Sequence, residues 1–100
     1  MAAKYWIKLY HEMLDDPKVA MLTDSLYRRF VECCLLAGES QDDGLLPDVP
    51  TMAWRLHIPA DTLTTDLSAL ARSELTEIVM VDDKPRWFMT NFKKRQEKLS

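Results

Sequence analysis

The side chains best suited to catalysis or metal binding in this sequence are two histidines and two adjacent cysteines. The run His11–Asp15 resembles the start of a zinc-binding helix, but the second histidine of the His-Glu-x-x-His pattern is missing. Cys33 and Cys34 stand in an apolar run, where thiols act as small hydrophobic groups, and His57 stands alone. With only two glycines, the chain also lacks a glycine-rich phosphate loop. We therefore predict no enzymatic activity, no metal site and no cofactor.

Hydroxyls and cations, by contrast, are placed where they suit contact with nucleic acid. On a helix expected near residues 61–72, the outer face carries Thr62, Thr65 and Arg72. Threonine hydroxyls bind phosphates or bases, and arginine reads guanine or clamps a phosphate. Asp66 shares this face and opposes the prediction, because phosphates repel a carboxylate. The alternative interpretations are a solvated face or a protein-docking surface.

A second basic group lies in an expected hairpin loop. Lys84 and Arg86 flank Pro85, where cations can contact a minor groove or a row of phosphates. They can equally neutralise Asp82 and Asp83, or protect an edge strand from aggregation.

The charge distribution singles out the C-terminal end. The whole chain has a net charge of −3, which is unfavourable for a nucleic-acid-binding protein. Residues 93–100 nevertheless carry four cations and one anion, which leaves residues 1–92 at −6. The four cations are Lys93, Lys94, Arg95 and Lys98. This basic tail is the strongest electrostatic candidate for phosphate contact, and the alternative is a solubilising helical extension.

Aromatic residues are concentrated before the expected core. Tyr5, Trp6 and Tyr10 lie in the segment expected to form a terminal strand. A terminal strand without a partner in its own chain can pair with a strand of a second copy. We therefore predict self-association into a homo-oligomer through these three side chains. Trp54 lies off the apolar stripe of its helix, and we expect it to pack against Trp6 within one domain. The alternative is that both are exposed at an interface.

Composition indicates one globular domain. The chain has 100 residues, of which 47% are hydrophobic, enough for a core in a single small domain. Its apolar runs fall short of the roughly 20 residues that a membrane helix needs. Neighbouring cysteines in a helix cannot easily pair with each other, so no disulfide framework is expected. We expect a cytoplasmic protein without membrane association.

Local signals predict the first half of the fold. Residues 4–10 fit a short strand slightly better than a helix, and Asp16 caps a short helical turn over residues 17–22. A long helix begins at Thr23 or Asp24 and ends at Gly38, a glycine expected just past the last helical residue. Residues 44–47 read as a very short strand.

The second half completes a recognisable order of elements. Asp48 caps a second helix, and Asp61 caps a third that buries leucines at positions 63, 67 and 70. Strands over 78–81 and 87–90 follow, joined by a four-residue loop. This order predicts an α+β fold of the winged helix-turn-helix type: a three-helix core, a C-terminal hairpin wing and a short N-terminal strand or helix. The expected winged-helix domain is 1–92, with 93–100 as a basic tail or the start of a linker.

Several short stretches are similar to one known family. Tyr5–Leu9, Asp15–Val19, Leu35–Gly38 and Trp87–Gln96 resemble the N-terminal domain of phage replisome organisers and related phage replication initiators. The resemblance covers nearly the whole chain. It implies a winged helix that binds the phage origin or joins the primosome, related at fold level to DnaD-like primosomal proteins. It also implies that a second region follows residues 93–100.

Two functions remain as hypotheses. The first is a double-stranded-DNA-binding module of a replication initiator or replisome organiser, which the basic tail and the resemblance favour. The second is a winged helix that contacts proteins, for oligomerisation or for recruitment of a helicase or helicase loader. The acidic body of the domain favours the second.

Overall fold

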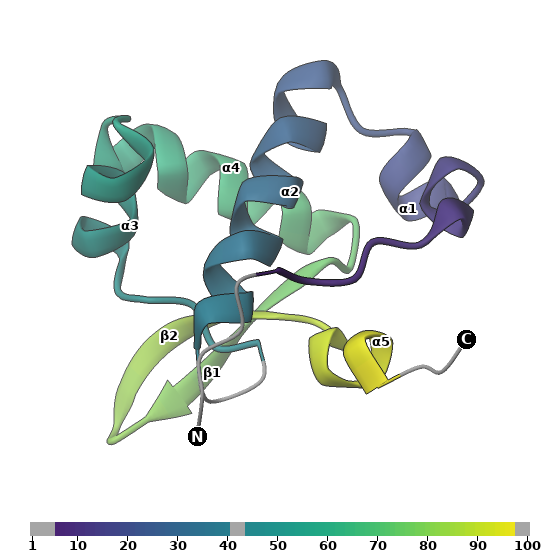
Figure 1. The fold of residues 1–100 in the computed structure, drawn as a ribbon. Helices are drawn as coiled ribbons and strands as arrows, with labels where there is room; N and C mark the ends of the chain where they lie inside the picture. Colours follow the sequence, from purple (N-terminus) through teal and green to yellow (C-terminus); the bar gives the residue numbers. More distant parts are fainter. Residues whose placement is uncertain (1–5, 41–43, 98–100) are drawn as a thin grey trace.

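The computed structural model describes residues 6–40 and 44–97 (Figure 1). Its helices are the 3₁₀ turn η1 (His11–Leu14), α1 (Pro17–Ala20), α2 (Asp24–Glu39), α3 (Val49–Leu56), α4 (Ala60–Arg72) and α5 (Phe92–Glu97). Its strands are β1 (Thr76–Val81) and β2 (Lys84–Met89). The expected α+β, winged-helix-like arrangement is confirmed, because α2, α3 and α4 precede an antiparallel hairpin. Among the described helices, none is long and apolar enough to cross a bilayer.

Three helices begin at the capping residues that the sequence predicts. The side chains of Asp16, Thr23 and Asp48 accept hydrogen bonds from backbone N–H groups two or three residues further along, at 3.0, 3.3 and 2.9 Å. Each bond satisfies one of the N–H groups that a helix leaves without an internal partner. These local signals therefore place the starts of α1, α2 and α3.

Two other helix boundaries differ from the prediction. The cap expected at Asp61 is wrong, because Pro59 precedes α4 and the Asp61 carboxylate accepts a bond from the next backbone N–H inside the first turn. The helix end expected at Gly38 is also wrong, because α2 continues to Glu39. A Cβ at position 38 would overlap Cγ2 of Ile7, so this glycine allows the N-terminal segment to approach the helix closely.

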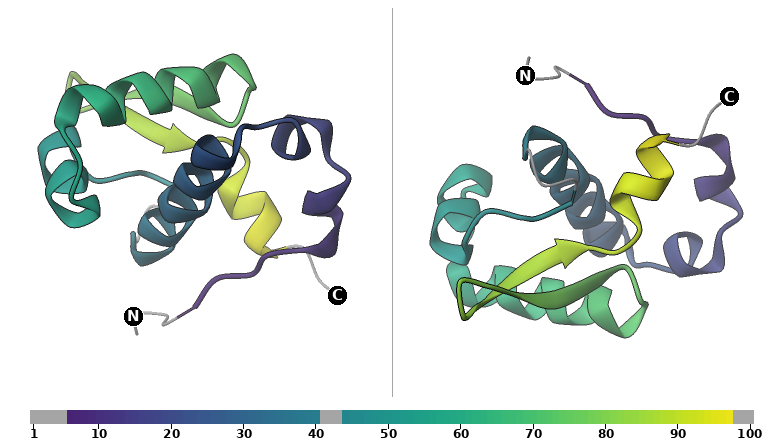
Figure 2. Two further views of the ribbon diagram at one scale, coloured as in Figure 1. Left: turned by 90° about the horizontal axis from the view of Figure 1, so that it is seen from above. Right: turned by 90° about the horizontal axis from the view of Figure 1, so that it is seen from below.

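The core lies where α4 meets α2, α3 and the base of the hairpin. Leu63, Leu67 and Leu70 are each 0% exposed, as their spacing predicted. Phe30 of α2 and Met52 of α3 are buried with them. Figure 2 shows α2 crossing the molecule between α4 and the η1–α1 region. One core therefore positions α2, α3 and α4 relative to one another.

The hairpin turn is tighter than predicted. A loop over residues 82–85 was expected, but β2 already begins at Lys84, and Pro85 pairs with Met80. The turn consists of Asp82 and Asp83, whose φ angles are 52° and 62°. Two successive residues with positive φ match the right-handed twist of the strands, and aspartate tolerates this conformation better than most residues.

The short strand expected over residues 44–47 is present as a single bridge to β2. Leu45 pairs with Phe88, and bonds of 3.0 and 2.8 Å join the neighbouring backbone groups. Gly44, at the start of this bridge, has a φ of 123°, a conformation that L-amino acids with a side chain rarely adopt. Strand β2 therefore lies between β1 on one side and this short segment on the other.

The N-terminal strand favoured by the sequence is absent from the described residues. Residues 6–10 form neither strand nor helix. Their backbone is held by a side chain instead: the amide of Gln96 donates to the carbonyl of Lys8 at 3.0 Å and accepts from its N–H at 2.9 Å. This pair of bonds replaces the strand partner that the alternating pattern had suggested.

The basic tail is not a free extension over its described part. Residues 93–97 belong to α5, whose first residue, Phe92, is only 6% exposed. Through Gln96, α5 is tied to the N-terminal segment. The described part of the tail is therefore the helix α5, and residues 98–100 lie outside the described residues.

Candidate nucleic-acid interface

The outer face of α4 presents the hydroxyls and the arginine expected from the sequence. Thr62, Thr65 and Arg72 are all exposed. The Thr65 hydroxyl donates to the carbonyl of Asp61 at 2.9 Å, so it offers lone pairs outward and must rotate to donate to a phosphate. Thr62 and Arg72 are ten residues apart, about 15 Å along a helix at 1.5 Å per residue. The face therefore spans more than the roughly 12 Å width of a major groove.

Asp66, the carboxylate that weakened the nucleic-acid prediction, is compensated from α2. Its Oδ2 accepts a 2.8 Å hydrogen bond from Nε of Arg29, and the two side chains are only 21% and 13% exposed. Arg29 also pairs with Glu32, which in turn lies 3.3 Å from Arg28. Burial acts to lower the pKa of Arg29, but the hydrogen bonds to the two carboxylates outweigh it and raise the pKa. The two cations Arg28 and Arg29 of α2 thus balance two carboxylates, Glu32 of α2 and Asp66 of α4.

The wing separates the two cations that were predicted to act together. Lys84 is exposed at the start of β2. Arg86 is half-buried, and its Nη2 donates a 2.6 Å hydrogen bond to the carbonyl of Leu46. Its Nε is buried and makes no hydrogen bond to a described residue. Arg86 thus ties β2 to the segment before α3, and Lys84 is the cation that the wing presents.

A groove lies between the wing and the N-terminal half of α4. Its walls include Thr64 of α4 and Ile78, Pro85 and Trp87 of the hairpin. These three hairpin residues share one face of the ribbon. Ile78 of β1 pairs with Trp87 of β2, and Pro85 lies two residues before Trp87 on the same strand, where side chains point to the same face. Thr64 of α4 and this face of the wing therefore line the same groove, together with residues 47–49.

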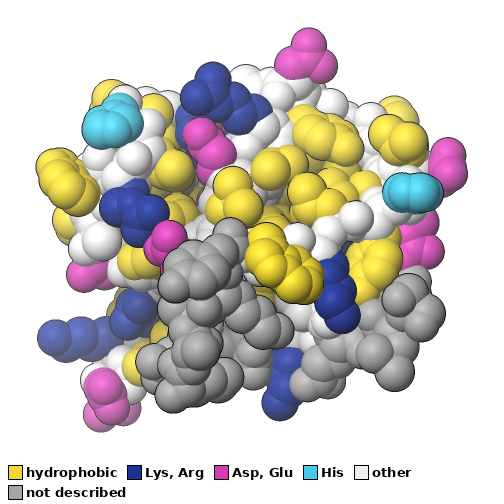
Figure 3. All heavy atoms as spheres, in the orientation of Figure 1, with side chains coloured by type: hydrophobic (Ala, Val, Ile, Leu, Met, Phe, Trp, Pro, Cys, Tyr) yellow, Lys and Arg dark blue, Asp and Glu magenta, His cyan; other side chains and the backbone are white. Residues whose placement is uncertain are grey.

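The cations of α5 do not extend that surface. In both views of Figure 2 the hairpin lies between α4 and α5. Lys93 and Lys94 are exposed and Arg95 is half-buried, while Lys98 lies outside the described residues. Figure 3 shows Lys and Arg interspersed with Asp and Glu around hydrophobic side chains on one face. The structure therefore places the wing beside Thr64 of α4, but it does not place the tail there.

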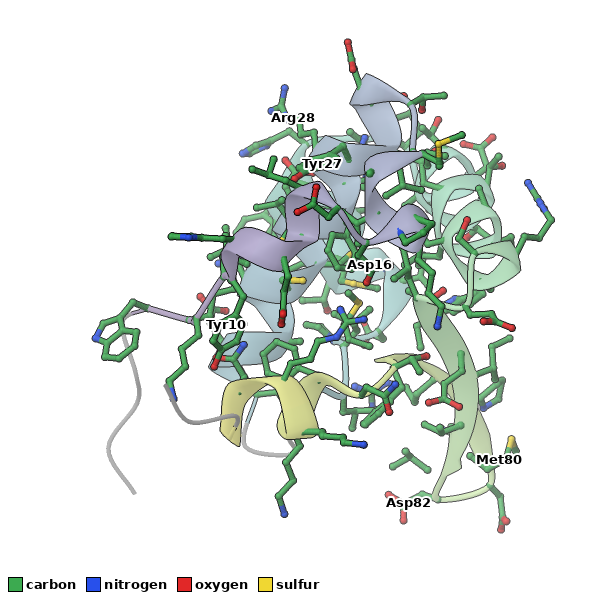
Figure 4. The ribbon with its side chains drawn as sticks, turned by 90° about the vertical axis from the view of Figure 1, so that its right-hand side faces the viewer. Tyr10, Asp16, Tyr27, Arg28, Met80 and Asp82 are labelled. Atoms are coloured by element: carbon green, nitrogen blue, oxygen red, sulfur yellow. The ribbon has the colours of Figure 1, made fainter. Side chains whose placement is uncertain are left out.

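The predicted packing of Trp6 against Trp54 is wrong. The two side chains are 66% and 75% exposed, which leaves little room for contact between them. Of the predicted self-association residues, Trp6 is thus available on the surface, Tyr10 is half-buried and Tyr5 lies outside the described residues. Met80, at 65%, adds an exposed apolar side chain near the tip of the wing (Figure 4).

The residues weighed for chemistry are placed as structural groups. Cys33 and Cys34 are buried, and burial raises the pKa of each thiol to about 12, which leaves both uncharged at neutral pH. His57 caps α3 with a positive φ of 61°. Among the described residues, no group of three His, Cys, Asp or Glu side chains is placed to hold a metal ion.

Sequence reasoning missed the ion pairs that join the helices. Arg29 connects α2 to α4 through Asp66, and Arg55 forms a two-pronged pair with Glu39 at 2.9 and 3.2 Å, which connects α3 to α2. The hydrogen bonds from Arg55 lower the pKa of Glu39. These partners are 37 and 16 residues apart, so periodicity carries no signal for them.

Comparison of the chain with protein-family models, curated proteins and solved structures finds no match.

Proposed function

We propose that this chain is a DNA-binding winged-helix module of a phage-type replication initiator or replisome organiser, acting on double-stranded DNA in the cytoplasm. The observation that carries the proposal is the surface of α4. Thr62, Thr65 and Arg72 are exposed there, whereas Asp66 is turned into an ion pair with Arg29. The carboxylate that would repel phosphates is therefore neutralised by the fold.

The order of elements supports the same use of α4. In helix-turn-helix proteins the second helix of the motif enters the major groove, and α3, the turn at residues 57–59 and α4 have this order. Thr64 of α4 and the wing residues Ile78, Pro85 and Trp87 line one groove, which supports a docking mode in which Lys84 meets phosphates when α4 lies in the major groove. We propose the replication origin as the target because short stretches such as Tyr5–Leu9 and Trp87–Gln96 resemble phage replisome organisers.

The test is a salt titration of DNA binding with charge-matched variants. Arg72→Gln, Lys84→Gln and Lys94→Gln each remove one cation, but Lys94 lies on α5, away from the proposed surface. For Lys84→Gln, the slope of log affinity against log salt should flatten by about 0.9 if one phosphate contact is lost. Arg72→Gln should flatten it similarly or reduce the preference for origin-like over random duplexes. Lys94→Gln should change neither.

Equal slope changes in all three variants would show that only net charge matters and would contradict the proposed surface. A flattened slope in Lys94→Gln alone would transfer the phosphate contacts to α5. If the parent chain binds no duplex even at about 50 mM salt, the protein-docking function takes its place.

That second function, a contact with another protein, is favoured by exposed tryptophans. Trp6 and Trp54 are 66% and 75% exposed, and large exposed aromatic side chains mark interfaces more often than open surface. The partner is a second copy of the chain or a replication protein such as a helicase or helicase loader. The N-terminal segment, with Trp6, is the part we expect to carry self-association.

Sedimentation across a range of concentrations tests this expectation. Trp6→Ala should weaken a dimer about tenfold or more, because a central indole contributes strongly to an interface. Trp54→Ala removes the same group from α3 and should leave the dimer intact. A parent chain that stays monomeric at the highest concentration would exclude self-association. Equal losses in both variants would contradict an interface confined to the N-terminal segment, because Trp54 would then contribute as much as Trp6.

A further inference from the structure

A cavity of about 660 Å³ lies on the side of the molecule away from the wing. Its walls come from the N-terminal segment, α2, the end of β2 and α5. Figure 4 faces this side, with Tyr10 and Asp16 above α5 and with Met80 and Asp82 far from them at the tip of the hairpin. Its volume lies within the range of small-molecule sites, roughly 300–1,000 Å³. The cavity is distinct from the surface proposed for DNA.

The floor of this cavity is apolar. It is lined by Val19, Phe30, Met89 and Phe92, which are 0%, 1%, 2% and 6% exposed. The thiol of Cys34 joins them and is uncharged at neutral pH. Two aromatic rings and polarizable sulfur atoms give favourable contacts to an aromatic or aliphatic body, so the floor suits an apolar part of a ligand.

The rim adds a cation, Arg95, for which the described residues offer no ion-pair partner. Arg95 is half-buried, and no carboxylate among the described residues lies within ion-pair distance of it. Arg95 and the Cys34 thiol line the same cavity. Burial raises the pKa of that thiol, and the charge of Arg95 opposes the rise. A half-buried guanidinium loses part of its hydration and gains most from an anionic partner.

Other charges stand around the same opening. Lys8 and Lys94 add positive charge, and Glu12 and Asp16 add two carboxylates. The Asp16 side chain is occupied as the cap of α1, where it accepts from the N–H of Lys18. The balance at the rim is therefore positive, with three cations against two carboxylates. The wall beside Lys8 is joined to α5 by the two hydrogen bonds of Gln96.

We propose that this cavity binds a small organic anion with an apolar or aromatic body, whose acidic group pairs with Arg95. The body lies on the floor formed by Phe30, Met89 and Phe92, and the acid faces the guanidinium. The site does not depend on the proposed DNA function, because it shares no residue with α4 or with the wing before Met89.

Two matched probes test the proposal with the intact chain. 8-Anilinonaphthalene-1-sulfonate and N-phenyl-1-naphthylamine share one ring system, but only the first carries an acidic group. Fluorescence titration should show saturable, one-to-one binding of both. Arg95→Gln should weaken the sulfonate about tenfold or more and leave the neutral probe within about twofold. Arg28→Gln removes an equally cationic side chain from the far side of α2 and should change neither.

The position of the site is checked by amide chemical-shift changes. With the sulfonate bound, they should centre on Cys34, Phe92 and Arg95; changes confined to Ile78, Trp87 and the start of α4 would place the probe in the other groove and overturn the proposal. Equal sulfonate affinity in the parent and Arg95→Gln would overturn it as well, as would an equal loss for both probes. If Arg95→Gln does not fold, Arg95→Met, which keeps the aliphatic length, takes its place in the comparison.

Discussion

Leu67→Ala should lower the free energy of unfolding by about 2–5 kcal/mol. Leu67 is 0% exposed at the centre of α4, and its own carbonyl accepts a 2.9 Å hydrogen bond from the buried hydroxyl of Thr76. Truncation removes apolar contacts with α2 and the base of the hairpin and leaves a cavity that the surrounding side chains fill only in part. Since small domains are stable by only about 5–15 kcal/mol, a large fraction of the protein would be unfolded by mild denaturant.

Thr65→Ala, two residues away on the same helix, is the matched control. Thr65 is exposed, and its hydroxyl bonds only to the backbone one turn earlier. Alanine compensates for that loss with a higher helix propensity, so the change should stay within about 0.5 kcal/mol. Urea denaturation followed by circular dichroism measures both variants. Equal midpoints for Leu67→Ala and Thr65→Ala would show that the inner and outer faces of α4 are assigned incorrectly.

Gly44→Ala should cost about 2–5 kcal/mol, for two reasons that act together. The φ angle of Gly44 is 123°, which strains any residue that has a Cβ. An added Cβ would also lie 3.0 Å from the ring of Phe88, 3.0 Å from Cβ of Phe92 and 3.2 Å from the carbonyl oxygen of Met89. Backbone atoms and a Cβ cannot move aside as the end of a flexible side chain can.

Gly38→Ala provides the comparison, since the chain has only two glycines. Position 38 is helical, so alanine gains about 0.5–1 kcal/mol of helix propensity against the overlap with a methyl group of Ile7. We expect a smaller loss there than at Gly44. The midpoint temperatures of thermal unfolding of both variants test this expectation. A Gly44→Ala protein that unfolds at the same temperature as the parent would contradict the strain expected at position 44.

Sequence patterns predicted those parts of the fold that depend on near neighbours. Asp16, Thr23 and Asp48 cap helices because a side-chain oxygen reaches a backbone N–H two or three residues away. The stripe formed by Leu63 and Leu67 is buried because helical periodicity places both on one face.

The errors arose where a distant residue decides the local structure. Gly38 looks like a helix terminator, yet α2 continues past it to Glu39, and the absence of a side chain there leaves room for Ile7. Residues 6–10 alternate like a strand, but Gln96 binds their backbone.

The candidate site was predictable in part for the same reason. The exposure of Thr62 and Arg72 was predictable, because helical periodicity places both residues away from the buried leucines of α4. The neutralisation of Asp66 by Arg29 was not, because 37 residues separate them. The cavity beside α5 had no sequence signal at all, since its walls come from both ends of the described chain and meet only in the folded molecule.

The bonds between Lys8 and Gln96 also bear on the order in which the molecule assembles. They join residues 88 positions apart, whereas the turn between β1 and β2 joins neighbours. Bringing distant residues together costs loop-closure entropy before the new contacts stabilise the chain. We therefore expect α2, α3, α4 and the hairpin to form first. The ends of the described chain then close last and, held by few contacts, open first during fluctuations. The cavity that they enclose is therefore the last part of the protein to take shape.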